Sequence, residues 1–293
     1  MDAIPGRRLP RPPRGFTLVE IVVVLFILGV VISMAVAITN ALTASQRLSN
    51  TTTRLTAIDA AIVQFVMQQK RLPCPADGTL DYTNSNAGIE TARTSAAGCT
   101  TNEAGGVVPW RVLGLSEGDI TDGWNRRMTY RVQAALAADN ALDMSQCDPA
   151  GTGPLVAGVC NSTTAAVNPC SSTALPNCTP PSFYLQNKGL TVKNVGGAVL
   201  MDPTTAPYTG AAYVVISTGS SGGGAYTSAG ALSNTATTDG NEEKKNYANL
   251  ALAAYYVDDA IADAGGATHF DDILSRPALL TVINKAALGP RSH

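Results

Sequence analysis

The chain has 293 residues, of which 45% are hydrophobic, 14% are charged and 5% are aromatic, and its formal net charge is −2. This length suffices for a membrane anchor and one sizeable domain, which could contain two subdomains. A chain with so few charges and a small negative balance lacks the broad basic surface that nucleic acids bind. We therefore predict no nucleic-acid partner.

Residues 1–15 are rich in proline and arginine, and the prolines prevent a helix there. Arg7, Arg8, Arg11 and Arg14 immediately precede an apolar run that begins at Phe16. Arginines in this position hold the N-terminal end of a membrane span in the cytoplasm, so the chain beyond the span is sent outward. A conventional secretory signal differs, because its apolar region is shorter and a small-residue cleavage site follows it.

The apolar run from Phe16 to Ile38 contains few polar residues, namely Thr17, Glu20 and Ser33. Roughly 20 helical residues cross the hydrocarbon core of a bilayer, so this run is long enough to span it. Its many valines are compatible with a membrane helix, because the backbone there must satisfy its own hydrogen bonds. The alternative of a buried core helix is disfavoured by the length and the uniform apolarity of the run.

Glu20 is the exceptional residue of this run. A charged side chain within a membrane span costs about 2.5–3.5 kcal/mol on insertion scales. Such a carboxylate needs a partner, and an amine on Phe16 would stand about one helical turn away. That amine exists only if the chain is cut between Gly15 and Phe16. The alternative is a glutamate that reaches the interface at the end of an ordinary anchor.

The segment Gly15-Phe16-Thr17-Leu18-Val19-Glu20, with a basic leader before it and an apolar helix after it, resembles the processing site of type IV pilins and of the pseudopilins of type II secretion. The resemblance implies that a prepilin peptidase cuts after Gly15 and methylates the new terminal amine of Phe16. It also implies that Glu20 pairs with the terminal amine of a neighbouring subunit. Ala37 departs from the family, because most major pilins have a helix-bending proline there, and this favours a minor pilin or a pseudopilin.

A helical pattern continues beyond the apolar run, and we expect one helix of about 55 residues that ends near Lys70. Apolar residues recur at steps of three and four in its second half and predict a stripe that packs on a sheet, formed by Leu55, Ile58, Ile62, Phe65 and Val66. The predicted organisation is therefore a leader at 1–15, a transmembrane and assembly helix at 16–38, an amphipathic continuation at 39–70, and an exported β-rich domain at 71–293.

All six cysteines follow the apolar run, at Cys74, Cys99, Cys147, Cys160, Cys170 and Cys178. An even number on the exported side is typical of disulfides formed in an oxidising compartment. Six cysteines allow 15 pairings, and the sequence alone does not choose among them. Of these we expect Cys74 to pair with Cys99 and the other four to pair locally, within a disulfide-rich loop insertion at 145–182. Zinc is disfavoured, because the chain has no Cys-x-x-Cys and its two histidines lie far from the cysteines in sequence.

The exported domain contains several short segments that favour strands, at residues 128–132, 183–185, 198–201 and 211–217. Trp110 and Trp124 are interpreted as core anchors rather than as a ligand platform, because the domain is poor in aromatic residues. The predicted fold class is α+β, with the long N-terminal helix packed on an antiparallel sheet.

Two other patterns suggest chemistry, and we interpret both as structural. The glycine-rich loop at 219–224 resembles a phosphate cradle, but no Lys-Ser/Thr follows it and no amphipathic helix opens after it. His269 stands near Asp271 and Asp272, but the chain has no zinc-protease motif, and a histidine in such a setting is usually structural. We therefore predict that the protein is not an enzyme and has no cofactor.

Asp239, Asn241 and Glu242 offer oxygen ligands that could hold calcium. Their spacing does not match a helix–loop–helix calcium site. A solvated acidic turn is the favoured interpretation, so the sequence predicts no metal site.

The sequence thus predicts a structural subunit of a type IV pilus or of a type II secretion pseudopilus, held in the bacterial inner membrane with its C-terminal domain in the periplasm. The resemblance implies as partners other pilins or pseudopilins, the prepilin peptidase, an inner-membrane assembly platform, and the lipid bilayer before assembly. The alternative is a single-pass anchored protein that does not polymerise and binds a ligand through the disulfide-rich region.

Overall fold

The computed structural model describes residues 17–100, 106–145, 184–233, 239–247, 254–262 and 266–290. The predicted cleavage site between Gly15 and Phe16 lies outside these residues. Nearly all of the predicted insertion at 145–182 also lies outside them, together with Cys147, Cys160, Cys170 and Cys178.

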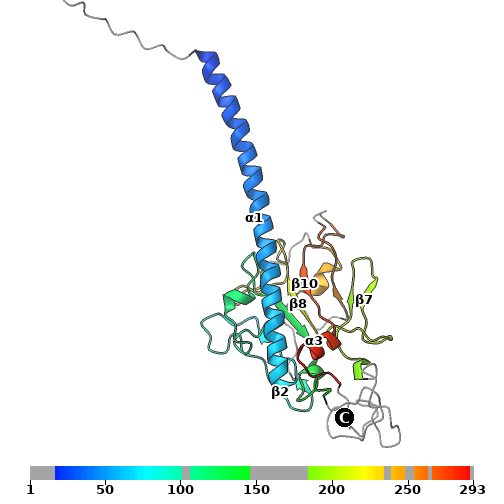
Figure 1. Ribbon diagram of the computed structural model, residues 1–293. Coiled ribbons are helices and arrows are strands. Elements are labelled where there is room, and N and C mark those ends of the chain that lie inside the picture. The colour runs from blue at the N-terminus through cyan, green and yellow to red at the C-terminus, as the bar shows by residue number, and fades with distance from the viewer. Residues whose placement is uncertain are drawn as a thin grey trace, which may run out of the picture. The chain divides into compact units, whose positions relative to one another are not determined.

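The first helix, α1, runs from Leu18 to Gln69 (Figure 1). The predicted single long helix is therefore confirmed, and its end differs from the expected Lys70 by one residue. The chain forms two compact units, residues 1–46 and 47–293, so α1 belongs to both. In the second unit the predicted apolar stripe of α1 is buried along its whole length, at Leu55, Ile58, Ile62, Phe65 and Val66. Burying such a side chain contributes about 1.5–3 kcal/mol.

The second unit is built around an antiparallel sheet of short strands. Its strand order is β1 (Ala76–Asp77), β4 (Gly106–Val107), β5 (Thr129–Val132), β8 (Tyr213–Ser217) and β10 (Ile273–Ser275). A short helix, α3 (Leu279–Lys285), follows β10 and buries Leu279, Val282 and Ile283 in the same core as the α1 stripe. The α+β class predicted from the sequence is confirmed.

Two smaller sheets accompany the main one in the described part of the chain. One pairs β2 (Arg93–Thr94) with β3 (Gly98–Cys99), and the other has the order β7 (Val199–Met201), β6 (Val192–Lys193), β9 (Tyr256–Val257). β6 and β9 run parallel, whereas the other pairs are antiparallel. Three 3-10 turns complete the described elements, namely η1 (Glu117–Ile120), η2 (Ala134–Ala137) and η3 (Glu243–Asn246).

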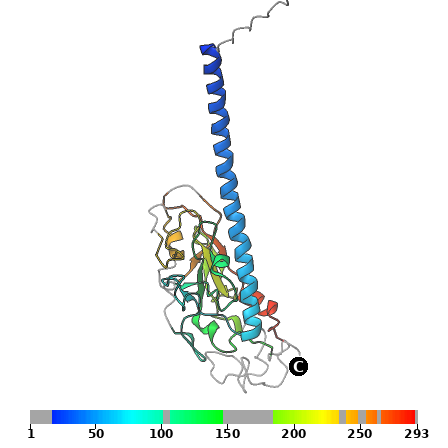
Figure 2. The ribbon, with the colours of Figure 1, turned by 90° about the vertical axis from the view of Figure 1, so that its left-hand side faces the viewer.

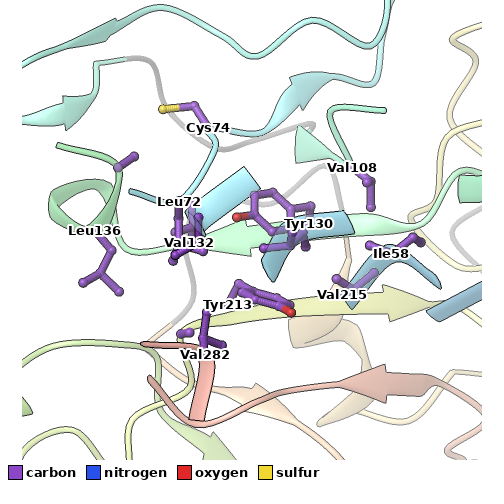
Figure 3. Close-up of a cluster of buried hydrophobic side chains, with 14 of the residues drawn as sticks. Ile58, Leu72, Cys74, Val108, Tyr130, Val132, Leu136, Tyr213, Val215 and Val282 are labelled. Carbon is purple, nitrogen blue, oxygen red and sulfur yellow. The ribbon is translucent and has the colours of Figure 1, made fainter. Parts of the chain in front are cut away.

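Strand β8 is buried on both faces, and this places it at the centre of the unit. Tyr213 and Val215 belong to the core that contains the α1 stripe, and Figure 3 shows them on the side of β8 that faces Ile58. Val214 and Ile216 belong to a second core with residues of β6, β7 and β9. Successive side chains of a strand point to opposite faces, so one apolar run serves both cores. Figure 2 shows the second half of α1 along one face of the sheet.

Hydrogen bonds to one carboxylate of α1 fix the helix on the sheet. The Tyr213 hydroxyl donates to Asp59 Oδ1 (2.9 Å), and the Ser275 hydroxyl donates to Asp59 Oδ2 (2.5 Å). These donors come from β8 and β10, so a single α1 residue joins two neighbouring strands. Burial raises the pKa of the Asp59 carboxyl, and the two hydroxyls partly offset that effect.

An ion pair and a disulfide hold the segment that follows α1. Arg71 binds both oxygens of Glu90, at 2.7 and 2.9 Å, and the Cys74 amide donates to the same carboxylate (3.0 Å). Burial raises the pKa of Glu90, but the guanidinium and the amide outweigh burial and leave that pKa below its usual value. Cys74 and Cys99 form a disulfide, with their Cα atoms 5.6 Å apart, which is the pairing predicted from the sequence.

Two sequence predictions about single elements are wrong. Tyr184 and Leu185 are helical rather than extended, because so short an apolar run is compatible with either structure and only tertiary packing decides between them. Trp110 is a buried core residue with the Arg127 guanidinium over its ring, as predicted, but Trp124 is only half-buried.

The turn at Asp122 and Gly123 touches the backbone of α1. The Gly123 amide donates to the Thr51 hydroxyl (2.9 Å), and Arg54 donates to the carbonyl of Thr121 beside it. A Cβ atom on Gly123 would lie 2.5 Å from the Arg47 carbonyl oxygen and 2.7 Å from its Cα atom. The position therefore requires glycine, because the contact is with backbone atoms that cannot rotate away.

We expect Gly123→Ala to lower the free energy of unfolding by about 2 kcal/mol, the typical cost of overpacking. Chemical denaturation of the full chain in detergent, followed by near-ultraviolet circular dichroism, measures this change. Gly118→Ala is the matched control, because its Cβ would meet only the Ser116 hydroxyl, at 3.6 Å. The control should stay within about 0.5 kcal/mol of the parent. Equal stability of the two variants would contradict the proposed close approach.

Candidate assembly site at the start of the first helix

α1 begins with reciprocal hydrogen bonds between Thr17 and Glu20. The Glu20 carboxylate accepts from the Thr17 amide (3.0 Å) and from its hydroxyl (3.2 Å), and the Glu20 amide donates to the Thr17 hydroxyl oxygen (3.3 Å). This arrangement is a capping box, which satisfies amides that have no carbonyl partner in the first turn of a helix. The carboxylate that the sequence singles out is thus directed at the N-terminal end of α1.

The capping box was not predicted from the sequence, although the signal for it is present. A Thr-x-x-Glu pattern directly before an apolar run is the signature of this motif. The sequence analysis considered Glu20 as a partner for an amine on Phe16, or as a glutamate that reaches the membrane interface. Capping of Thr17 and pairing with an amine on Phe16 both direct the carboxylate toward the N-terminal end of the helix. The capping box is therefore compatible with the predicted pairing.

The first unit exposes apolar side chains on all sides of α1. Leu18 is 78% exposed and Phe26 is 72% exposed, and the apolar residues between and beyond them are also uncovered. The most apolar window of this helix has a mean hydropathy of 3.2, and none of it is buried among the described residues. By length and composition α1 can cross a membrane, and a helix that is apolar all round needs lipid or other helices around it.

Other polar side chains of this half of α1 are satisfied within the helix. The Ser33 hydroxyl donates to the Val30 carbonyl (2.8 Å), and the Thr39 hydroxyl donates to the Val36 carbonyl (2.9 Å). Such local bonds let hydroxyl groups enter an apolar surrounding at little cost. Glu20 differs from them because it carries an ionisable group.

Residues 11–36 match the family model described as the prokaryotic N-terminal methylation motif. The matched span contains the predicted cleavage site, Glu20 and most of the apolar run. This match supports the resemblance to type IV pilins and pseudopilins. It has no significant match among curated proteins or solved structures. The motif and the apolar helix near the N-terminus together indicate a membrane-anchored pilin.

The structure describes some of the predicted processing and assembly positions but not others. Glu20 lies in the first turn of α1, whereas Gly15 and Phe16 lie outside the described residues. α1 continues through position 37, where the sequence has alanine in place of the proline of most major pilins.

The three oxygen-bearing residues considered for calcium differ in burial and in partners. Asp239 is buried, Asn241 is exposed, and Glu242 instead pairs with Lys245 (2.6 Å) and accepts from the Tyr255 hydroxyl (2.8 Å). Asn241 and Glu242 are thus surface groups of a polar turn.

We expect Thr17→Ala to accelerate hydrogen exchange of the Glu20 amide about fivefold, because this change removes its acceptor and a lost cap costs about 1 kcal/mol. The measurement is amide exchange of the full chain in detergent micelles, read on peptides that cover the start of α1. Thr17→Ser keeps the hydroxyl and should exchange at the parental rate. A Thr17→Ala rate equal to that of Thr17→Ser would contradict the capping box.

Proposed function

We propose that this pilin-like chain is a structural subunit, a minor pilin or a pseudopilin, of a type IV pilus or of a type II secretion pseudopilus. It is cut between Gly15 and Phe16 by a prepilin peptidase and methylated on Phe16. It stays in the inner membrane, with its N-terminus in the cytoplasm and its domain in the periplasm, until an assembly platform adds it to other pilins or pseudopilins. Proteins of this type are generally structural rather than enzymatic.

The proposal rests on the methylation motif at the start of α1, a helix whose two halves have different surfaces. The apolar side chains from Leu18 to Val36 are exposed, whereas the stripe from Leu55 to Val66 is buried in the second unit. Such a helix can exchange lipid for neighbouring helices in its first half while its second half keeps the domain folded. The bulk of the domain and the alanine at position 37 favour a minor subunit or a pseudopilin over a major pilin.

In this proposal, Glu20 sets the position of each helix relative to its neighbours in the bundle. In a bundle of apolar helices, burial of the side chains gives cohesion but allows many relative positions. An unpaired carboxylate in that environment costs free energy. Arrangements of subunits in which the Glu20 carboxylate meets the terminal amine of a neighbour are therefore favoured. The capping box holds the carboxylate at the end of the helix where that amine would arrive.

Processing is tested by the mass of the N-terminal peptide. Protein extracted from the native membrane should begin at a methylated Phe16, whereas protein from a host without the peptidase should begin at Met1 or at its natural trimming product. Mass spectrometry of the N-terminal peptides distinguishes these forms. An uncut N-terminus in the native membrane would contradict the proposal and favour the anchored, non-polymerising binding protein.

The role of Glu20 is tested by incorporation into filaments. We expect Glu20→Ala to be cleaved normally but to be incorporated about tenfold less, which corresponds to about 1.4 kcal/mol. Ser33→Ala is the matched control, because Ser33 is satisfied within its own helix and its loss should leave incorporation unchanged. Sheared filaments or cross-linked pseudopili, quantified by immunoblot against the membrane pool, give the ratio. Equal incorporation of both variants would remove Glu20 from the mechanism.

A further inference from the structure

A hollow of about 410 Å³ in the second unit is lined by residues of the small sheet of β7, β6 and β9 and of the turns beside it. Its lining residues come from three segments, within 191–193, 199–204 and 254–255. We call it the Tyr255 pocket, and its walls include Thr191, Lys193, Val199, Asp202, Thr204 and Tyr255. Small-molecule sites occupy about 300–1,000 Å³, so this pocket is at the small end of that range.

Lys193 places an ammonium group in the Tyr255 pocket. Its Nζ atom lies 4.3 Å from the centroid of the Tyr255 ring. Within the described residues, Lys193 belongs to none of the ion pairs. A contact with an aromatic ring orients an ammonium group and leaves N–H donors that can reach other acceptors. Lys193 can therefore donate hydrogen bonds to a ligand in the pocket.

Asp202 places a carboxylate in the same pocket. Its Oδ1 accepts from the amide and from the hydroxyl of Thr204, both at 2.7 Å. Hydrogen bonds from Thr204 and Thr205 lower the pKa of the Asp202 carboxyl to about 2, so this group is ionised at neutral pH. Among the ion pairs of the described residues, none includes Asp202. A cation and an anion thus line one hollow without pairing with each other.

The Tyr255 ring is held by residues that do not line the pocket. Its hydroxyl donates to Glu242 Oε2 (2.8 Å) and accepts from Lys245 Nζ (2.6 Å), and these two partners also pair with each other. The ring is therefore positioned before any ligand arrives. Val199 adds a second apolar wall, because its side chain lines the pocket and is 52% exposed. The pocket thus combines apolar surface with charged groups.

The charges and the surface of the Tyr255 pocket together indicate the class of ligand. The formal charges of Lys193 and Asp202 cancel, which disfavours a ligand with a net charge. Hydrogen bonds to charged groups are the stronger ones, and a hydroxyl group can serve them both as donor and as acceptor. A pyranose sugar carries several hydroxyls around a ring whose C–H groups pack on apolar side chains. A neutral sugar therefore matches every group that lines the pocket.

We propose that the Tyr255 pocket binds a neutral carbohydrate, with a pyranose unit of a glycan inside it. Hydroxyls of the sugar donate to the Asp202 carboxylate and accept from the Lys193 ammonium group. Its C–H groups pack against Tyr255 and Val199, and the threonine hydroxyls of the pocket add further polar contacts.

Carbohydrate binding goes beyond the proposed function, because it needs neither cleavage nor assembly of the chain. All of the pocket's lining residues belong to the second unit, whereas Glu20 and the apolar half of α1 belong to the first. A pocket that binds no sugar would therefore leave the proposed structural function standing, and a chain that is never processed could still bind sugar.

Saturation-transfer difference NMR of the full chain tests binding directly. The chain is kept in dodecylphosphocholine micelles, because this detergent has no sugar headgroup that would compete. The probes are the methyl pyranosides of glucose, galactose, mannose and N-acetylglucosamine. We expect saturable binding of at least one probe with a Kd of about 1–10 mM, since a small ligand with few polar contacts binds weakly. A panel without any saturable binding would overturn the proposal.

The same panel separates two sources of the glycan. Preference for N-acetylglucosamine supports an amino-sugar glycan, such as that of the bacterial cell wall, and preference for a hexose supports a neutral polysaccharide outside the cell. Glycylglycine is the competing probe, because a zwitterion also matches one cation and one anion. Tighter binding of glycylglycine than of every sugar would overturn the assignment of a carbohydrate.

Two substitutions of charged residues locate the site. Lys193→Met and Asp202→Asn should each weaken sugar binding about tenfold, because each removes a hydrogen bond to a charged group. Asp81→Asn is the matched control, since Asp81 Oδ1 accepts from the Thr83 amide (2.8 Å) and hydroxyl (2.7 Å) in the same way but Asp81 does not line the pocket. The control should bind like the parent. Unchanged binding in both pocket variants, or equal weakening in the control, would contradict the proposed site.

A third substitution fills the hollow and keeps every polar group. Ala254 lines the pocket and is exposed, so Ala254→Phe adds volume there without disturbing the core. We expect this variant to lose saturable sugar binding, while its near-ultraviolet circular dichroism shows that it is folded. A folded Ala254→Phe chain that binds sugar with the parental Kd would overturn the Tyr255 pocket as the binding site.

Discussion

The structure depends on one constraint, which is that a single helix must satisfy two different surroundings. The first half of α1 is apolar all round, so water is a poor solvent for every one of its faces. The second half is apolar along one stripe, which is buried in the core of the second unit. The same backbone carries both patterns, because α1 continues from one to the other as a single helix.

The polar groups of α1 follow from this constraint. Hydroxyls in the apolar half donate to carbonyls of their own helix, so they need nothing from their surroundings. In the second half the polar partner is tertiary, because Asp59 accepts from Tyr213 and Ser275. Glu20 belongs to neither kind. It is capped by Thr17 but remains ionisable, and an apolar surrounding makes such a group selective for an arrangement that brings it a cation.

The second unit is held by polar contacts as much as by strand pairing, because its strands are short. Arg127 is fully buried, and its guanidinium binds Glu117 and the carbonyls of Gly78, Leu80 and Ser228. One side chain thereby links segments that are far apart in the sequence. Buried carboxylates also link distant segments, because Glu243 of η3 accepts from the Asp271 amide and Asp271 accepts from the Ser221 amide.

The sequence by itself determined the features that depend on periodicity and local chemistry. These are the length of α1, its buried stripe, the central strand β8 and the processing motif, since each is carried by neighbouring residues in the chain. Tertiary structure alone decided that Tyr184 and Leu185 are helical, because so short a run fits either conformation. It also decided that Glu243, Asp271 and Asp272 lie close together while Glu242 pairs with Lys245. The proximity of these carboxylates depends on how β8, β10 and η3 pack together, and the spacing of the residues in the sequence does not predict that packing.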